Sequence, residues 1–142
     1  MNKINLLVCN RINAASVEIE RPFSVISVYT PEETKNVFLN RPENILYLCF
    51  SDCSSLDLAE FDSDIVMFSD IQAKSILNFV NYEISKGVNN FLIHCDAGIS
   101  RSPGIAVALN EIYNGIKTIR GEWRLYNSFV YRKIMENFYT KN

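Results

Sequence analysis

The sequence predicts an α/β fold in which a central, mostly parallel sheet is flanked by helices. Short apolar runs of strand length alternate along the chain with longer segments of helical periodicity, and this alternation is typical of parallel sheets. The chain has 142 residues, of which 48% are hydrophobic and 21% charged, a composition that suits one globular core. We therefore expect a single domain over residues 1–142.

Four apolar runs are predicted to form the strands, at residues 4–8, 23–29, 45–50 and 91–94. The second run is rich in Val, Ile and aromatic residues, and Pro22 and Pro31 flank it. The third run, 45–50, is apolar at almost every position, which predicts a central strand that is covered on both faces.

Four segments are predicted to be helical, at residues 32–39, 70–86, 102–113 and 128–139. The first is expected because Pro31 precedes two acidic residues, a composition typical of a first helical turn. Ser69 and Gln72 form a capping-box pattern at the start of the second helix. Gly115 is placed to end the third helix, and Asn127 is placed to cap the last one.

Composition excludes several classes of partner. The net charge is −2, which argues against the basic surface of a nucleic-acid-binding protein. The apolar run at 6–9 is too short for a signal peptide, and no stretch approaches the roughly 20 apolar residues of a membrane span. We therefore expect a cytoplasmic protein that binds neither nucleic acid nor membrane. Its four cysteines are expected to be free thiols, and a single histidine leaves little to build a zinc site.

One loop carries the chemistry that the sequence predicts. Between the fourth strand and the third helix, residues 94–102 read His-Cys-Asp-Ala-Gly-Ile-Ser-Arg-Ser. This segment places Cys95 six positions before Arg101, with Gly98 between them. Ligands bind parallel sheets at the carboxyl ends of the strands, and helix N-termini attract anions, so an anion is expected here.

These residue types suit the transfer of a phosphoryl group to sulfur. A loop curled around Cys95 can direct backbone N–H groups inward, and together with the helix dipole and Arg101 they activate the thiol as a nucleophile. The same groups can hold phosphate oxygens, and a planar guanidinium binds two of them at once. Gly98 permits the tight turn. The predicted substrate-binding residues are Asp96, Ala97, Gly98, Ile99, Ser100 and Arg101.

Residues 94–102 resemble the His-Cys-x5-Arg-Ser/Thr signature of the protein tyrosine phosphatase superfamily, and look most like its small dual-specificity branch. The segment Asn127-x-x-Val130-x-x-Lys133-Ile134 is similar to the Asn-x-x-Phe-x-x-Gln-Leu pattern of that branch, with Val130 and Lys133 as departures. The resemblance covers the chain from about residue 45 onward. It implies a protein-tyrosine-phosphatase-like fold, no metal or organic cofactor, and a phosphorylated protein as the substrate.

By the same resemblance, Cys95 attacks phosphorus and forms a phosphocysteine intermediate, while Arg101 stabilises the transferring phosphoryl group. The Ser102 hydroxyl stabilises the thiolate as it leaves in the second step. His94 orients the loop through hydrogen bonds and does not touch the substrate.

The general acid has several candidates. The resemblance implies an Asp on a loop before the signature, and residues 51–64 contain Asp52, Asp57, Asp62 and Asp64. Asp52 directly follows the third strand, whereas Asp62 and Asp64 precede Cys95 by 33 and 31 residues, close to the usual separation in the family. We favour Asp52 because the strand anchors it, and we keep Asp62 and Asp64 as alternatives.

The sequence thus predicts a cysteine-dependent phosphomonoester hydrolase, namely a protein tyrosine or dual-specificity phosphatase. One alternative is a phosphatase for a non-protein phosphomonoester such as an RNA 5′-phosphate. Another is a phosphate-binding module without turnover, a pseudophosphatase. Phosphoinositide phosphatases of the superfamily carry Lys within the loop, and Asp96 and Ile99 in this loop disfavour a highly phosphorylated lipid headgroup.

Overall fold

The computed structural model describes residues 3–56, 60 and 62–140, and these residues form the expected α/β architecture around a parallel sheet. The strands lie in the order β1-β4-β2-β3. They are β1 (Asn5–Cys9), β2 (Phe23–Tyr29), β3 (Ile45–Cys49) and β4 (Asn90–His94). The helices are α1 (Arg11–Ala14), α3 (Asp70–Ser85), α4 (Arg101–Asn114), the short 3-10 helix η1 (Gly121–Trp123) and α5 (Ser128–Tyr139).

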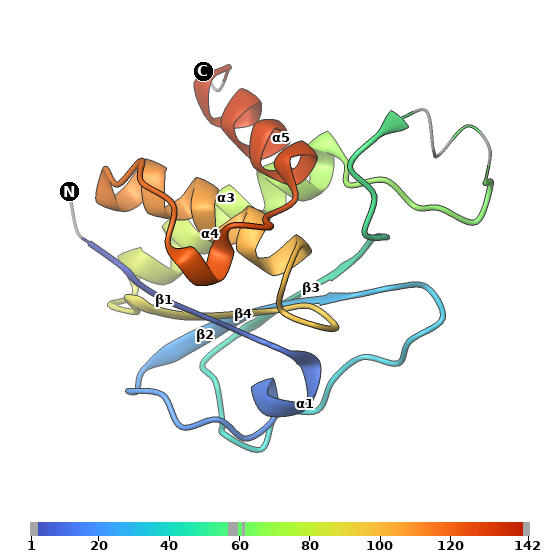
Figure 1. The fold of residues 1–142 in the computed structure, drawn as a ribbon. Helices are drawn as coiled ribbons and strands as arrows, with labels where there is room; N and C mark the ends of the chain where they lie inside the picture. Colours follow the sequence, from blue (N-terminus) through green and yellow to red (C-terminus); the bar gives the residue numbers. More distant parts are fainter. Residues whose placement is uncertain (1–2, 57–59, 61, 141–142) are drawn as a thin grey trace.

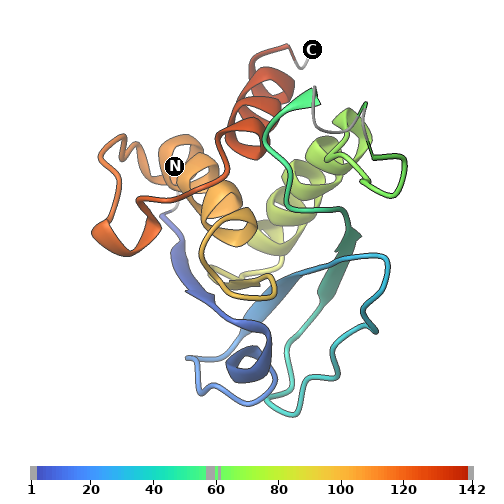
Figure 2. The same ribbon diagram turned by 45° about the vertical axis from the view of Figure 1, so that its right-hand side comes forward.

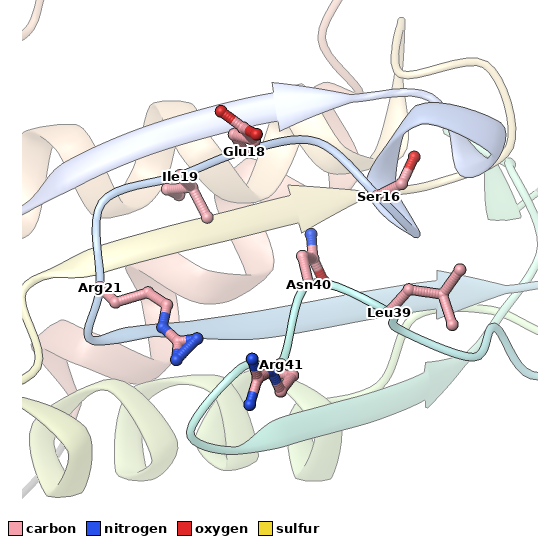
Figure 3. Close-up of a pocket in the computed structure, with 7 residues that line it drawn as sticks. All are labelled: Ser16, Glu18, Ile19, Arg21, Leu39, Asn40 and Arg41. Carbon is pink, nitrogen blue, oxygen red and sulfur yellow. The ribbon is translucent and has the colours of Figure 1, made fainter.

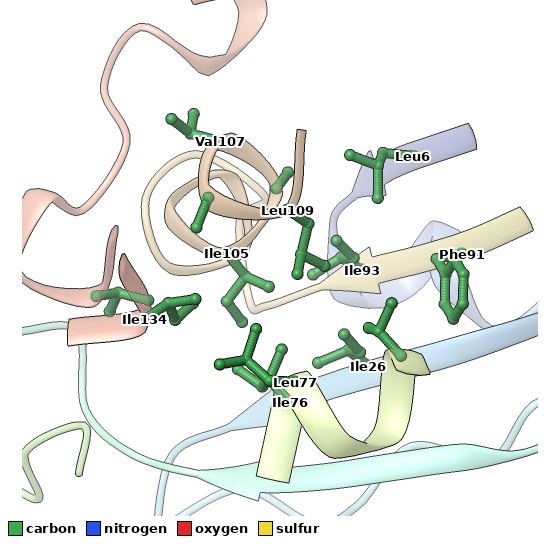
Figure 4. Packing of buried hydrophobic residues seen from close by; sticks show 14 of the residues in the cluster. Leu6, Ile26, Ile76, Leu77, Phe91, Ile93, Ile105, Val107, Leu109 and Ile134 are labelled. Atoms are coloured by element: carbon green, nitrogen blue, oxygen red, sulfur yellow. The ribbon is translucent and has the colours of Figure 1, made fainter. Parts of the chain in front are cut away.

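Helices α3, α4 and α5 lie over one face of the sheet (Figure 1 and Figure 2). Helix α4 contacts β1 and β4, and α5 packs against both α3 and α4. The main apolar core fills the space between these layers (Figure 4). It includes the fully buried side chains of Ile26 and Ile93 from the sheet and Ile76, Ile105 and Ile134 from the helices. Full burial of such a side chain contributes about 1.5–3 kcal/mol.

The other face of the sheet is covered by α1 and by irregular segments. Ala14, Phe23, Val25 and Leu92 form a smaller buried apolar cluster there. A pocket of about 420 Å³ opens among the segments 16–21 and 39–41 (Figure 3). Its lining contains no residue of the 94–102 loop, so this pocket is separate from the predicted site.

Strand β3 lies at the edge of the sheet, so the prediction of a central strand at 45–50 is wrong. Strand β2 lies between β4 and β3 and is buried from Phe23 to Val28, whereas only Leu48 is buried in β3. The apolar residues of β3 are partly buried, and Leu48 is buried. Tyr47 also donates its hydroxyl to the Asn36 carbonyl oxygen at 3.0 Å. Apolar side chains indicate burial of a face, but they do not show whether the backbone pairs on one side or two.

The predicted helix at 32–39 is also wrong, because the chain makes a single turn there and then continues without regular structure. The Glu33 carboxylate accepts a hydrogen bond from the Thr30 backbone N–H at 2.8 Å, which closes that turn locally. Val37 and Leu39 are each 75% exposed. The segment therefore lacks a buried apolar face, and short helices depend on such a face for stability.

The other helix ends agree with the sequence. Ser69 and Gln72 form the predicted capping box, with the Ser69 hydroxyl accepting from the Gln72 backbone N–H. Asn127 caps α5 by accepting from the Val130 N–H at 3.1 Å, and Gly115 ends α4 with a φ of 70°. None of the described helices is both long and apolar enough to cross a membrane.

Candidate active site

The loop 95–100 leaves the carboxyl end of β4 and enters α4 at Arg101. Because the sheet is parallel, the segments that follow β1 and β3 meet this loop at the same edge. Arg11, after β1, donates its backbone N–H to the Asp96 carbonyl oxygen at 3.0 Å. Phe50, after β3, accepts a hydrogen bond from Arg101 Nη1 at 2.8 Å. The loop is therefore supported on both sides.

Gly98 allows the loop to pass close to the end of β1. Its φ is +75°, a conformation that side-chain-bearing residues rarely adopt. A Cβ at this position would also lie 2.8 Å from the Cys9 carbonyl carbon and 2.9 Å from the Cys9 oxygen. Glycine is therefore required on two independent grounds, the backbone conformation and the close approach to β1.

Cys95 lies at the base of the loop and is only 2% exposed. Its Sγ atom is 3.0 Å from the Ser102 Oγ atom, and the Ser102 backbone N–H donates to the same sulfur at 3.4 Å. Ser102 belongs to the first turn of α4, where the helix dipole favours negative charge. A hydroxyl, a backbone N–H and the helix N-terminus thus surround the Cys95 sulfur.

Arg101 is buried, at 5% exposure, although it lines the cavity that contains Cys95. One N–H group of the guanidinium donates to the Phe50 carbonyl oxygen. Within the described part of the chain its other N–H groups have no acceptor, which leaves them able to bind an anion. The hydrogen bond to Phe50 fixes the orientation of the side chain.

Glu33 contributes to the electrostatics on the side of α1. Its carboxylate lies 3.9 Å from Arg11 Nη1 and also experiences the charge of Arg101. Partial burial raises the pKa of Glu33, but the hydrogen bonds from Thr30 and the two arginine charges outweigh burial and hold it below its usual range. Glu33 is therefore an anion that partly balances the cationic loop.

A cavity of about 400 Å³ opens above the loop. It is lined by Asp52, Cys95, Asp96, Ala97, Ile99, Ser100 and Arg101. These are seven of the ten site residues that the sequence predicts. Gly98 lies against β1, Ser102 lies beside the sulfur, and His94 is buried in β4.

The candidate acids lie in different places. Asp52 lines the cavity, and its Oδ1 atom accepts hydrogen bonds from Ser100 Oγ at 2.8 Å and from Asn127 Nδ2 at 3.1 Å. Asp62 and Asp64 line another hollow, which contains neither Cys95 nor Arg101. Asp57 is outside the described residues. The geometry therefore groups Asp52, and not Asp62 or Asp64, with the nucleophile.

His94 is 1% exposed and uses both ring nitrogens. Nδ1 lies 3.1 Å from the Cys95 carbonyl oxygen, and Nε2 lies 2.7 Å from Ser27 Oγ. Because a carbonyl oxygen can only accept, Nδ1 carries the proton and Nε2 accepts from the Ser27 hydroxyl. Burial, followed by the nearby charges of Arg11 and Arg101, lowers the pKa of His94 despite its hydrogen bond to Cys95, so the ring is neutral near pH 7.

Three contributors to the site were not found from the sequence. Ser27 is a single hydroxyl residue in an apolar strand, and Glu33 belongs to the segment expected to be helical. Asn127 is predicted as a helix cap and as the first residue of the family-like segment 127–134, with no role at the site. The only sequence signal for Ser27 is its position as a polar residue in an apolar run. Nothing in the sequence indicates that Asn127 also reaches Asp52, 75 residues away.

Among comparisons with known proteins, a solved structure supports the fold. No protein-family model matches the sequence, and no curated protein sequence matches it. Among solved structures, the chain is similar to the human tyrosine phosphatase-like serine/threonine/tyrosine-interacting protein, with a TM-score of 0.63 and 15% identity. That alignment covers 96% of this chain and 92% of the human protein. A second similar structure is Tk-PTP in its active form, with a TM-score of 0.47 and 22% identity over 84% of this chain and 76% of Tk-PTP.

The match to the human structure extends over nearly the whole of both chains. The observed fold is the one that the signature at 94–102 implies. The chain therefore has the α/β fold of a tyrosine phosphatase-like protein, which is the protein-tyrosine-phosphatase-like fold that the sequence predicts.

Proposed function

We propose that this protein is a cysteine-dependent phosphomonoester hydrolase, a protein phosphatase of the tyrosine or dual-specificity type. The observation that carries the proposal is the grouping of Cys95, Arg101 and Asp52 around one cavity of about 400 Å³, with Ser102 Oγ 3.0 Å from the sulfur. A nucleophile, an anion-binding cation and a proton donor are the groups that phosphoryl transfer to sulfur requires.

In the first step the Cys95 sulfur attacks phosphorus, an S–P bond forms, and the P–O bond to the leaving group breaks. Arg101 and the backbone N–H groups of the loop bind the equatorial phosphoryl oxygens, where charge gathers in the transition state. Asp52 transfers its proton to the leaving oxygen, so the product departs as a neutral alcohol or phenol. The enzyme is left as a phosphocysteine with Asp52 ionised.

In the second step a water molecule attacks phosphorus and the S–P bond breaks. Asp52 accepts the proton from this water, which restores its acid form. The departing sulfur leaves as a thiolate, and the hydroxyl of Ser102 donates a hydrogen bond to it. Inorganic phosphate is released, and no metal or organic cofactor takes part in the proposed steps.

A phosphorylated protein side chain is the substrate class that the cavity supports. Ile99 is 52% exposed and lines the cavity, so an apolar contact is available to a substrate residue. The loop residue Asp96 is also exposed and adds negative charge. A highly phosphorylated headgroup would be repelled by this carboxylate, whereas a phosphoprotein brings only one phosphate to the loop.

The direct test is hydrolysis of p-nitrophenyl phosphate between about pH 5 and 8 by four proteins. They are the wild type, Cys95→Ser, Asp52→Asn, and the paired Asp62→Asn/Asp64→Asn variant. We expect vanadate-sensitive turnover that Cys95→Ser abolishes, and an acid-dependent rate that Asp52→Asn loses but the paired variant retains. Equal turnover by Cys95→Ser and the wild type would sink the covalent mechanism. Phosphotyrosine and phosphoserine peptides then distinguish the two protein phosphatase types.

A second candidate function is phosphate binding without turnover. It is favoured by the two hydrogen bonds to Asp52 Oδ1, because donors of this kind stabilise a carboxylate and also tie the segment after β3 to the loop 95–100. The human structural neighbour is described as phosphatase-like and as an interacting protein. Wild-type protein that binds vanadate or phosphate but hydrolyses neither p-nitrophenyl phosphate nor phosphopeptides would establish this alternative.

A further inference from the structure

Asn127 joins three parts of the molecule that meet at the cavity. It is 3% exposed and lies at the start of α5. Its Oδ1 atom accepts from the Val130 N–H at 3.1 Å, and its Nδ2 atom donates to Asp52 Oδ1 at 3.1 Å and to the Cys53 carbonyl oxygen at 3.3 Å. Its backbone N–H donates to the Ser100 carbonyl oxygen at 2.9 Å. One residue therefore connects α5, the segment after β3 and the loop 95–100, which we call the phosphate loop.

The orientation of the Asn127 amide is determined by these partners. Exchanging its oxygen and nitrogen would direct an N–H group at the Val130 N–H, which is also a donor. It would also direct the amide oxygen at the Asp52 carboxylate and the Cys53 carbonyl, which are both acceptors. Three favourable contacts would become repulsive, so Asn127 acts only as a donor toward Asp52.

The position of Asn127 is set closely by α4. A Cβ on Gly104 would lie 2.7 Å from the Asn127 carbonyl oxygen, which means that α4 and the start of α5 approach within backbone contact. The Ser100 carbonyl oxygen accepts from the Gly104 N–H at 3.0 Å as well as from Asn127. The Asn127 backbone is therefore fixed by contacts to Gly104 and Ser100, and Ser100 belongs to the phosphate loop.

Both side-chain donors to Asp52 bind the same oxygen. Ser100 Oγ and Asn127 Nδ2 both donate to Oδ1, and no described residue donates to Oδ2. When Asp52 is in its acid form, the two donors to Oδ1 favour the proton on Oδ2, because the carbonyl-type oxygen accepts hydrogen bonds better than the protonated one. The proton for the leaving group is therefore carried on Oδ2, while Oδ1 anchors the side chain.

We propose that Asn127 is a positioning residue for the general acid. Its amide fixes the Asp52 side chain at the cavity and leaves Oδ2 as the oxygen that carries the transferable proton. The inference rests on the proposed phosphatase function, and it adds a role for a residue that touches neither the substrate nor Cys95. General acid catalysis contributes roughly 10²–10⁴-fold, so an acid that loses its position loses part of this factor.

The test uses a variant that keeps the capping of α5 but removes the hydrogen bond from the side-chain amide to Asp52. Asn127→Ser keeps an oxygen that can accept from Val130, as serine is a good N-cap, but it lacks the donor to Asp52. Rates are measured on p-nitrophenyl phosphate, which has a good leaving group, and on phenyl phosphate, which needs protonation. We expect Asn127→Ser to lower kcat on phenyl phosphate by at least about tenfold, with a much smaller loss on p-nitrophenyl phosphate.

Asn137→Ser is a matched control. Asn137 lies on the same helix, is also buried, and donates its amide to Asp70 Oδ1 and to the Lys133 carbonyl oxygen, both at 2.8 Å. Its replacement removes the same kind of contact away from the cavity. We expect it to lower both rates equally or not at all, and thermal unfolding of both variants reports their stability.

A double variant separates positioning from general support. If Asn127 acts through Asp52, Asp52→Asn/Asn127→Ser is no slower on phenyl phosphate than Asp52→Asn alone, because the two changes remove one function. Losses that multiply in the double variant, or a single Asn127→Ser loss that is equal on both esters, would overturn the positioning role and leave the hydrolase intact. A wild type that turns over neither ester would instead overturn the hydrolase itself.

Discussion

The hydroxyl of Ser27 and the Nε2 atom of His94 lie 2.7 Å apart in the centre of the sheet. The two residues are direct neighbours in the pairing of β2 with β4, and both are buried. This contact holds His94 in the tautomer whose Nδ1–H donates to the carbonyl oxygen of Cys95. A buried hydrogen bond in the sheet thus orients the start of the loop 95–100.

His94 predicts a pH dependence of stability. Burial lowers its pKa below the unfolded value of 6.5, so the unfolded chain binds a proton more readily than the folded chain. The contribution of neutral His94 to the free energy of unfolding is present above pH 6.5 and is lost as the pH falls from 6.5 through the folded-state pKa. Urea unfolding at about pH 7.5 and 5.5 should show this loss in the wild type. The His94→Asn variant should lose less stability over the same interval, and an equal loss in both proteins would contradict the assignment.

Gly98→Ala should lower stability and turnover by more than a strained backbone conformation alone would cause. The substitution combines a φ of +75° with a Cβ that would lie 2.8 Å from Cys9 backbone. We expect the free energy of unfolding to fall by about 1–3 kcal/mol and turnover to fall at least about tenfold, because the loop must move.

Gly115→Ala is the control for Gly98→Ala. Gly115 has a similar φ of +70°, but a Cβ there meets nothing within 4 Å. This variant should lose roughly 1 kcal/mol of stability and keep its activity. Comparable losses of activity in the two variants would show that the approach to β1 is unimportant.

Cys9 should be an unreactive thiol at neutral pH. Burial, and then the charge of Cys95, raises the pKa of Cys9 to about 11. Alkylation requires the thiolate, so iodoacetamide at pH 7 should leave Cys9 unmodified in the folded protein. Peptide mass spectrometry measures the labelling of each cysteine. In the Cys95→Ser variant Cys9 should react faster, because one of the two causes of the raised pKa is removed. Rapid labelling of Cys9 in the wild type would contradict this picture.

Ser102→Ala should slow the second chemical step. Its hydroxyl is 3.0 Å from the sulfur, and in the proposed mechanism it donates to the thiolate as the phosphocysteine breaks down. Without it, we expect the intermediate to accumulate and a burst of p-nitrophenol to precede a steady rate that is reduced roughly tenfold or more. Rapid-mixing measurements detect the burst. A reduced rate without a burst would place the effect of Ser102 on the first step.

Much of the fold could be predicted because its signals are local. The strand at 23–29 and the helix at 128–139 have the bounds that the sequence predicts, and the caps at Ser69 and Asn127 form as expected. Each of these features depends on residues within one or two turns of each other. The two errors concern context: the segment 32–39 leaves Val37 and Leu39 exposed instead of burying an apolar face, and β3 pairs with only one of the described strands.

By itself, the sequence determined the α/β fold class and the loop from Cys95 to Arg101. Alternating strands and helices, and the six positions that separate Cys95 from Arg101, are properties of the chain that can be read without knowing the fold. Only the tertiary structure decided which acid accompanies that loop. Asp52 reaches Ser100 across 48 residues and Asn127 across 75, whereas Asp62 and Asp64, with their more usual spacing, line a different hollow. Contacts between distant segments follow from how strands and helices pack, and no local pattern of residues records that packing.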